Sequence, residues 1–378
     1  MKDLKAVVNA YQLIDFSRHK AALATVVRVR GSSYRSPGAR MLITDDGRWT
    51  GSISGGCLEG DALRKARAVM QEGKAIVVTY DTREASNQNL GISLGCNGII
   101  DVLIEPVDAA SQNNPIKFFE KFTSIREPVV MATAISSSLI GEKLLVRWGE
   151  KRQSANAFYN GVAKDLDQLF TTRKSEVKKY LINGEETEVF LEFVSPSISL
   201  LIFGGGFDAR PVCQLAKSLG WDVAVTDECV AHIAPVFFPE ADQLSLCRRE
   251  FVDRDFEITP YTACILMSHN YAYDRDVLRK LIKTATPYIG ILGPRKRFDK
   301  MQEEFLLTGL ILSEEDNLRI HSPIGLDIGA EAPDEISVSI VAEIQAKFSK
   351  RDGRFLKLLD KPIHQRSSHN DQVYKIGF

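Results

Sequence analysis

The sequence predicts an α/β protein with a mixed α/β N-terminal domain over residues 1–195, a parallel-sheet domain over residues 196–350 and a C-terminal tail over residues 351–378. Three observations support this prediction. The chain of 378 residues is longer than one ordinary domain. Its first half mixes helical patterns with hairpin signals. After Pro196, which breaks the pattern and marks the boundary, apolar strands and helices alternate regularly.

The N-terminal domain is expected to begin with a helix and to continue with strands joined by tight turns. Apolar residues recur at helical spacing over residues 2–16. Asp46-Gly47 and Asn183-Gly184 are hairpin signals. The other elements predicted in this half are strands over residues 21–30, 40–43, 49–53, 75–80, 99–104, 129–134, 143–146, 180–182 and 188–194, and helices over residues 58–71 and 158–179.

The composition is that of an ordinary globular protein, with 44% hydrophobic and 26% charged residues. The formal net charge of -1 provides no large basic surface for nucleic acid or anionic lipid. The N-terminus lacks the apolar segment of a signal peptide, and no apolar run reaches the ~18 residues that a membrane span needs. We therefore expect a cytoplasmic protein that binds neither nucleic acid nor membranes and whose six cysteines are free thiols.

Two cysteines follow glycines in loops, an arrangement that presents a reactive thiol to a ligand. Cys57 follows Gly55 and Gly56 and precedes a helical run, whose free N–H groups favour an anion or a thiolate. Cys96 lies in a similar loop between Gly95 and Gly98. The opposing interpretation is that a free cysteine is usually a small buried hydrophobic residue. We expect that role for the four cysteines that share no metal-binding spacing, Cys213, Cys229, Cys247 and Cys264.

A glycine-rich loop follows the first apolar strand of the second domain, predicted over residues 200–203. The loop Gly204-Gly205-Gly206-Phe207-Asp208-Ala209 fits the pattern G-x-G-x-x-A and opens a helix that runs to Leu219. Gly204 permits the tight turn, Gly206 admits a phosphate close to the backbone, and Ala209 lets the helix pack near the strand. This order of strand, loop and helix predicts a Rossmann-like parallel-sheet domain.

Three further residues are expected near this loop, because ligands of open α/β sheets bind at the carboxyl ends of the strands. Asp227 ends the next strand about 20 positions after Gly204, where a ribose-binding acid is expected, although it could also cap a turn. His269 follows the strand over residues 263–267 and precedes a helix over residues 276–284, and it is either a functional or a structural histidine. Arg295 follows the strand over residues 288–292 and either neutralises a phosphate or begins a solvated helix.

Together these stretches resemble the XdhC/CoxI family, the accessory proteins for maturation of xanthine dehydrogenase and carbon monoxide dehydrogenase. The resemblance covers nearly the whole chain and rests on residues 51–60, 94–106, 201–227, 267–274, 288–297, 320–330 and 333–344. It implies a maturation factor or chaperone that binds and protects the molybdenum cofactor, assists its sulfuration and passes it to an apo molybdenum hydroxylase such as xanthine dehydrogenase. A cysteine desulfurase is the implied sulfur donor.

The resemblance also implies roles for the residues singled out above. The glycine loop and Asp227 would hold the phosphate of molybdopterin, or the pyrophosphate and ribose of its dinucleotide form. Cys57 and Cys96 would protect the molybdenum–sulfur end, since thiols suit soft metals. Phe207 departs from the family, whose members often carry histidine at this position.

Two other functions stay open at the level of sequence. An NAD(P)-dependent oxidoreductase would use Asp227 on the ribose and His269 as a proton carrier, without a partner protein. A regulatory nucleotide-binding module would bind its ligand without depending on thiols. A metal hydrolase is not expected, because the sequence contains neither H-E-x-x-H nor paired C-x-x-C motifs. The client enzyme, the form of the cofactor and the choice between monomer and homodimer stay open.

Overall fold

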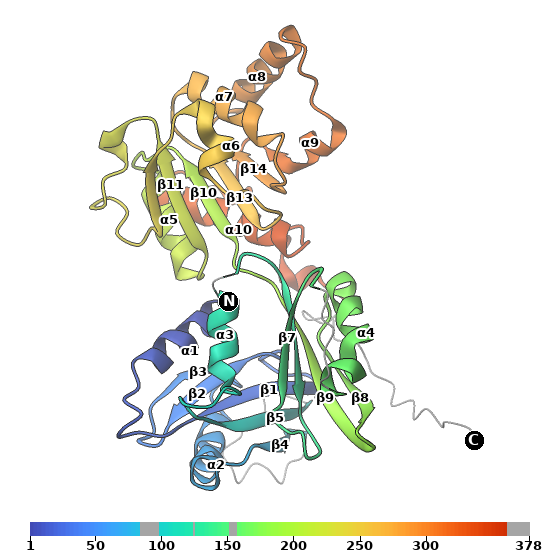
Figure 1. Ribbon diagram of the computed structural model, residues 1–378. Helices are drawn as coiled ribbons and strands as arrows, with labels where there is room; N and C mark the ends of the chain where they lie inside the picture. The colour runs from blue at the N-terminus through green and yellow to red at the C-terminus, as the bar shows by residue number, and fades with distance from the viewer. Residues whose placement is uncertain (84–97, 124, 151–156, 361–378) are drawn as a thin grey trace, which may run out of the picture. The chain divides into compact units, whose positions relative to one another are not determined.

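The computed structural model describes residues 1–83, 98–123, 125–150 and 157–360. The chain divides into two compact units, Met1–Pro196 and Ser197–Phe378 (Figure 1). Within the described residues, no helix is both long and apolar enough to cross a membrane.

The first half of unit 1 is a five-stranded antiparallel sheet in the order β3-β2-β1-β5-β4. Its strands are β1 (Ala21–Gly31), β2 (Arg40–Thr44), β3 (Trp49–Gly51), β4 (Ile76–Asp81) and β5 (Gly98–Val107). Successive side chains of β1 point to opposite faces. Ala22 and Ala24 pack in the cluster that contains α2 (Glu59–Glu72), whereas Leu23 packs in the cluster of α1 (Lys2–Gln12) and α3 (Pro115–Thr123). The predicted hairpin at Asp46-Gly47 is confirmed, while α3 was not predicted.

The second half of unit 1 is a four-stranded antiparallel sheet in the order β7-β6-β9-β8, against which α4 (Ala157–Thr172) packs. Its strands are β6 (Val129–Ala134), β7 (Lys143–Arg147), β8 (Glu176–Ile182) and β9 (Glu185–Val194). The helix predicted over residues 158–179 is wrong at its C-terminal end. Helix α4 (Ala157–Thr172) stops before Arg173, which has a φ of 54°, and β8 then pairs with β9 across the predicted Asn183-Gly184 turn.

Two buried ion pairs join strands of the two sheets in unit 1. The Arg40 guanidinium of β2 pairs with the Glu192 carboxylate of β9, with Nη1 3.0 Å from Oε1, and also lies over the ring of Phe119. The Lys143 ammonium of β7 pairs with the Glu105 carboxylate of β5. Because a buried charge without its partner is strongly destabilising, these pairs fix how the two sheets meet.

Unit 2 contains a six-stranded parallel sheet in the order β12-β11-β10-β13-β14-β15. Its strands are β10 (Ser199–Phe203), β11 (Asp222–Asp227), β12 (Gln243–Leu246), β13 (Thr262–Leu266), β14 (Tyr288–Ile291) and β15 (Ile320–His321). The chain adds β11 and β12 on one side of β10 and then crosses to add β13, β14 and β15 on the other. The direction of winding therefore changes between β10 and β13, and the crevice at their carboxyl ends is where such sheets bind ligands.

Helices cover both faces of this sheet (Figure 1). Apolar side chains of α5 (Ala209–Ser218) and α10 (Pro333–Phe348) form one core with the sheet, and those of α7 (Tyr271–Leu281) and α8 (Arg295–Leu307) form another. The helix predicted to begin at Asp276 begins at Tyr271 instead, because the Asn270 side chain caps it by accepting the N–H groups of Ala272 and Tyr273. The mixed α/β architecture of unit 1 and the parallel sheet of unit 2, with helices on both faces, confirm the predicted fold class.

Candidate functional site

The glycine loop lies at the carboxyl end of β10, and its first glycine is required by the backbone. Gly204 has a φ of +121°, and its N–H donates to the carbonyl of Thr226 at 2.7 Å. A Cβ at this position would lie 2.5 Å from backbone atoms of Met267 and Ser268. Only glycine fits between β11 and the end of β13, so the tight turn expected at Gly204 is present.

The next two glycines differ in what surrounds them. A Cβ on Gly205 would lie 2.4 Å from the carbonyl oxygen of His232, so the turn after β11 covers this residue closely. A Cβ on Gly206 would meet, among the described residues, only the edge of the His269 ring, at 3.6 Å and 3.8 Å. The loop is thus closed at Gly205 and open at Gly206, the glycine predicted to admit a phosphate.

Helix α5 begins directly after the loop with the buried Ala209, which packs in the core beneath the sheet as expected. The preceding Asp208 turns its carboxylate to His269, with Oδ2 3.2 Å from Nε2. His269 has a φ of 58°, and its side chain is 63% exposed, so the imidazole is accessible beside Gly206. The structure therefore brings the predicted His269 to the predicted loop and adds Asp208, which the sequence analysis missed.

Asp227 ends β11 as predicted, but its carboxylate points into the protein. Oδ2 accepts the N–H of Gly205 at 2.9 Å and lies 3.0 Å from Nδ1 of His232, while Oδ1 accepts the N–H of Cys229 at 2.8 Å. The residue is only 4% exposed. In this arrangement Asp227 supports the glycine loop and the turn that follows β11. Ribose binding by this acid stays a prediction.

A buried acid holds the loop on which His269 lies. Asp274 of α7 accepts the hydroxyl of Ser268 at 2.6 Å and pairs with Arg297 of α8 at 2.7 Å. Burial raises the pKa of Asp274, while the hydrogen bonds from Ser268 and Arg297 oppose that rise. The predicted Arg295 begins α8 at the same edge of the sheet, and its side chain is 80% exposed. Asp274 was not predicted as a site residue, since its pairing with Arg297 depends on how two helices pack.

In unit 1, the predicted Cys57 lies in a tight turn just before α2. Gly56 has a φ of +113°, and a Cβ on Gly55 would lie 3.1 Å from the ring of Tyr34, so neither glycine is easily replaced. The Cys57 thiol is half-buried, and Sγ lies 3.6 Å from the hydroxyl of Ser54. The predicted loop geometry is present. Cys96, the second predicted thiol, lies outside the described residues.

A carboxylate that the sequence analysis missed organises this turn. Glu59, the first residue of α2, accepts the hydroxyl of Ser52 at 2.7 Å and the N–H groups of Ser54 at 2.9 Å and Leu58 at 3.2 Å. Burial opposes its ionisation, but the hydrogen bonds from Ser54 and Ser52 outweigh burial and hold the pKa of Glu59 below its usual value. The negative group at the start of α2 is therefore Glu59. The Ser54 hydroxyl connects it to the thiol, because this hydroxyl donates to the Glu59 carboxylate and lies next to Sγ of Cys57.

The remaining cysteines divide into two groups. Cys213, Cys247 and Cys264 are buried, as predicted, and burial raises the pKa of the Cys213 and Cys264 thiols to about 12. Such thiols are unreactive at neutral pH. Cys229 is exposed, so its predicted space-filling role is wrong. It lies just beyond the end of β11, in a turn outside the sheet.

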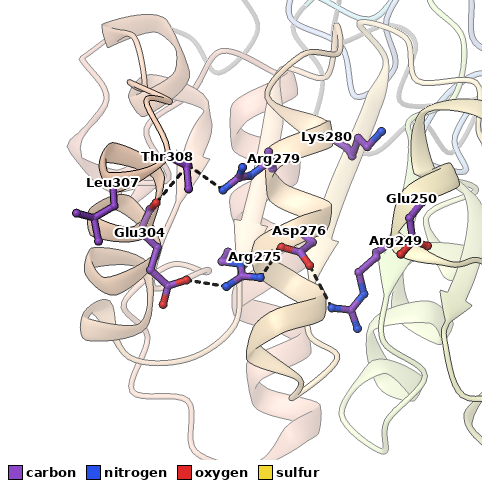
Figure 2. Close-up of a pocket in the computed structure, with 9 residues that line it drawn as sticks. All are labelled: Arg249, Glu250, Arg275, Asp276, Arg279, Lys280, Glu304, Leu307 and Thr308. Carbon is purple, nitrogen blue, oxygen red and sulfur yellow. Dashed lines mark hydrogen bonds and ion pairs between the residues drawn. The ribbon is translucent and has the colours of Figure 1, made fainter.

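A cavity of about 490 Å³ in unit 2 lies apart from these residues, between α7, the end of α8 and the short helix η3 (Arg249–Phe251) (Figure 2). Two of its three arginines have acidic partners, since Arg275 bridges Asp276 and Glu304 and Arg249 contacts Asp276, and the third, Arg279, donates to the hydroxyl of Thr308. None of the predicted site residues that the structure describes is among its nine lining residues. The glycine loop, rather than this cavity, is the candidate site of unit 2.

Comparison with known proteins agrees with this architecture. A family model described as the XdhC Rossmann domain matches residues 200–344, and one described as the XdhC and CoxI family matches residues 17–81. A probable subunit of xanthine dehydrogenase from Bacillus subtilis (strain 168) is 31% identical over 328 residues, which cover 86% of this chain and 93% of that protein. The molybdenum cofactor insertion chaperone PaoD of Escherichia coli (strain K12) is 25% identical over 328 residues, covering 86% of this chain and 82% of PaoD.

A solved structure shares the fold over almost its full length. The crystal structure of a xanthine dehydrogenase from Bacillus halodurans is 29% identical, with a TM-score of 0.72, and the match covers 93% of this chain and 97% of that one. The two family models, the curated relatives and the shared fold lead to one conclusion: the chain belongs to the XdhC and CoxI family.

Proposed function

We propose that this protein is a maturation factor that binds and protects the molybdenum cofactor, assists its sulfuration and delivers it to an apo molybdenum hydroxylase such as xanthine dehydrogenase. Family membership supports this role, as does the name of the relative PaoD, a molybdenum cofactor insertion chaperone. The observation that carries the proposal is the glycine loop, which is open at Gly206 beside the accessible His269.

The phosphate end of the cofactor fits the open side of this loop. A group that approaches Gly206 meets no side chain on that residue, and the nearest described neighbour is the edge of the His269 ring. The positive end of the α5 dipole favours an anion at the same place, while the N–H groups of Ala209 and Arg210 already donate within the turn. His269 would donate a hydrogen bond from a ring N–H. Arg295 begins α8 directly after β14, which lies two strands, or roughly 10 Å, from β10 along the sheet edge. Its guanidinium would add positive charge.

The sulfur end of the cofactor calls for a soft donor, and we propose Cys57 for this role. Thiolates suit soft metals and sulfur chemistry, and the half-buried thiol is held in a defined turn by Glu59 and Ser54. Cys96 is proposed as a second thiol on the basis of its glycine-flanked loop. A cysteine desulfurase would supply the sulfur, so this chain would position the cofactor for sulfuration rather than generate sulfide itself.

The test is to purify the chain from a molybdenum-replete host and to measure its molybdenum and pterin content, together with its ability to activate an apo molybdenum hydroxylase. We expect wild type to retain the cofactor, and Gly206→Val, which fills the open side of the loop, to retain at least about tenfold less while staying folded. Thermal unfolding of the variant serves as the control for folding. Cofactor retention equal to wild type would remove the loop from the site, and wild type without molybdenum or pterin would contradict the proposed cargo.

A further inference from the structure

We infer that the crevice of unit 2 selects a compact phosphomonoester and excludes the ribose diol of an NAD-type dinucleotide. The reason is that Asp227, Gly205 and His232 contact one another at the position where such a ribose would bind. This inference rests on the proposed function and narrows its ligand class. It concerns the residue that dinucleotide-binding folds normally use for the ribose.

The carboxylate of Asp227 has little capacity left for a ligand. A carboxylate offers roughly four acceptor positions. Three are directed at Gly205 N–H, Cys229 N–H and Nδ1 of His232, at 2.9 Å, 2.8 Å and 3.0 Å. A ribose diol needs two positions, so at least one internal bond would have to break. Breaking the buried bond to the Gly205 N–H would weaken binding by about tenfold to a hundredfold, whereas the half-exposed His232 side chain could be released at a smaller cost.

The turn that follows β11 also occupies the space above the loop. The main chain of His232, in η2 (Val230–His232), approaches Gly205 so closely that even a Cβ would lie 2.4 Å from its carbonyl oxygen and 2.8 Å from its carbonyl carbon. Ile233 and Phe238, which follow, are buried in the core of unit 2 and anchor the turn. A nucleoside lying along the end of β11 would therefore have to displace an anchored segment.

Neighbouring loops tie the start of this turn in place as well. Glu228 accepts a hydrogen bond from the side-chain amide of Asn270 at 2.8 Å and pairs with Arg249 at 2.7 Å. Asn270 is also the cap of α7, so its position is fixed. The closed side of the crevice is thus held by residues from three elements, whereas Gly206 and His269 border the open side.

The two sides together define the ligand class. A phosphate can approach the N-terminus of α5 through Gly206 without touching Asp227. A phosphomonoester such as the molybdopterin tail needs no more than this. An NAD-type ligand would gain the same phosphate contacts but would find no diol acceptor at Asp227, so its ribose would add no affinity.

The experiment compares three probes by calorimetric titration of the full chain at fixed ionic strength: pyrophosphate, ADP and 2′,3′-dideoxy-ADP, which differs from ADP only in the diol. We expect ADP and dideoxy-ADP to bind wild type within about threefold of each other, and Gly206→Val to lose all probes that bind. An ADP preference above threefold that disappears in Asp227→Asn overturns the inference, and the wild-type ratio decides the matter even if that variant fails to fold.

The outcomes separate this inference from the proposed function. Failure of pyrophosphate and both nucleotides to bind at millimolar concentration contradicts the phosphate loop, on which both the proposed function and this inference rest. Binding of pyrophosphate together with a strong ADP preference supports the loop and overturns the closed position.

Discussion

The Glu59 carboxylate lies 2.9 Å from the backbone nitrogen of Ser54 and accepts its N–H, so the first residue of α2 holds the turn that precedes its own helix. Ser52 and Leu58 donate to the same carboxylate. Cys57 lies within this ring of hydrogen bonds. The position of the thiol therefore depends on a charge that is close to it in sequence and belongs to the helix.

Glu59→Ala should destabilise unit 1 by about 2–3 kcal/mol, because it leaves buried hydroxyl and N–H donors without an acceptor. Glu59→Gln keeps one acceptor oxygen and should cost about half as much. Urea unfolding of the two variants measures the difference. Equal stability of Glu59→Ala and wild type would show that the hydrogen bonds are not needed for the turn.

The pH dependence of stability should follow from the same residue. The pKa of Glu59 is lower in the folded protein than in the unfolded chain, so its contribution is fully present above about pH 4.3 and is lost as the pH falls through the folded pKa. As the pH falls from about 4.3 to the folded pKa, wild type should lose more stability than Glu59→Gln, whose side chain cannot ionise. Parallel pH profiles of the two proteins would contradict the assignment.

Cys57→Ser should reduce activation of the client enzyme by on the order of tenfold or more, because a hydroxyl is a poor soft donor. The matched control is Cys229→Ser, which removes an exposed thiol from the turn after β11 and should leave activation unchanged. Activity of the client after incubation with each variant gives the comparison. Full activation by Cys57→Ser would make that thiol structural.

Two adjacent glycines should respond oppositely to a methyl group. Gly205→Ala places a Cβ against the carbonyl of His232 and should destabilise unit 2 by about 1–3 kcal/mol. Gly206→Ala approaches the edge of the His269 ring at ordinary contact distance and should leave stability unchanged or raise it by less than about 1 kcal/mol. Thermal unfolding of both variants distinguishes these outcomes, and a similar loss in both would contradict the open side of the loop.

The buried pair between Arg40 and Glu192 gives a prediction on the core of unit 1. Arg40→Met should cost about 3–5 kcal/mol, since Glu192 would remain buried without a partner, whereas Arg40→Met combined with Glu192→Leu should recover most of that loss. The exposed pair Lys179–Glu186 is the control, because Lys179→Ala should cost less than about 1 kcal/mol. Denaturant unfolding of all three variants tests the contrast.

The glycine loop could be predicted because its signal is contiguous in sequence. An apolar strand, Gly204 with positive φ and a helix starting at Ala209 all appear where the pattern places them. The partners of Asp227 could not be predicted, since Gly205, Cys229 and His232 meet only through the geometry of a short turn without periodic pattern.

Other differences have equally local causes. The start of α7 is predictable in principle, because Asn270 is a favoured helix cap. The end of α4 was not predictable, since residues 173–179 carry no glycine or proline, and the segment from Glu176 becomes a strand by pairing with β9. Exposure of Cys229 depends on where the turn after β11 lies, which composition does not reveal.

The spacing between β10 and β13 at the crevice is set by main-chain hydrogen bonds. Phe203 and Leu266 are partners in the register of β10 and β13, and the N–H of Met267 donates to the carbonyl of Phe203 at 2.8 Å. Any residue type other than proline can make these bonds. Substitutions at exposed positions such as Phe207 therefore alter the chemistry offered to a ligand without altering the spacing of these two strands.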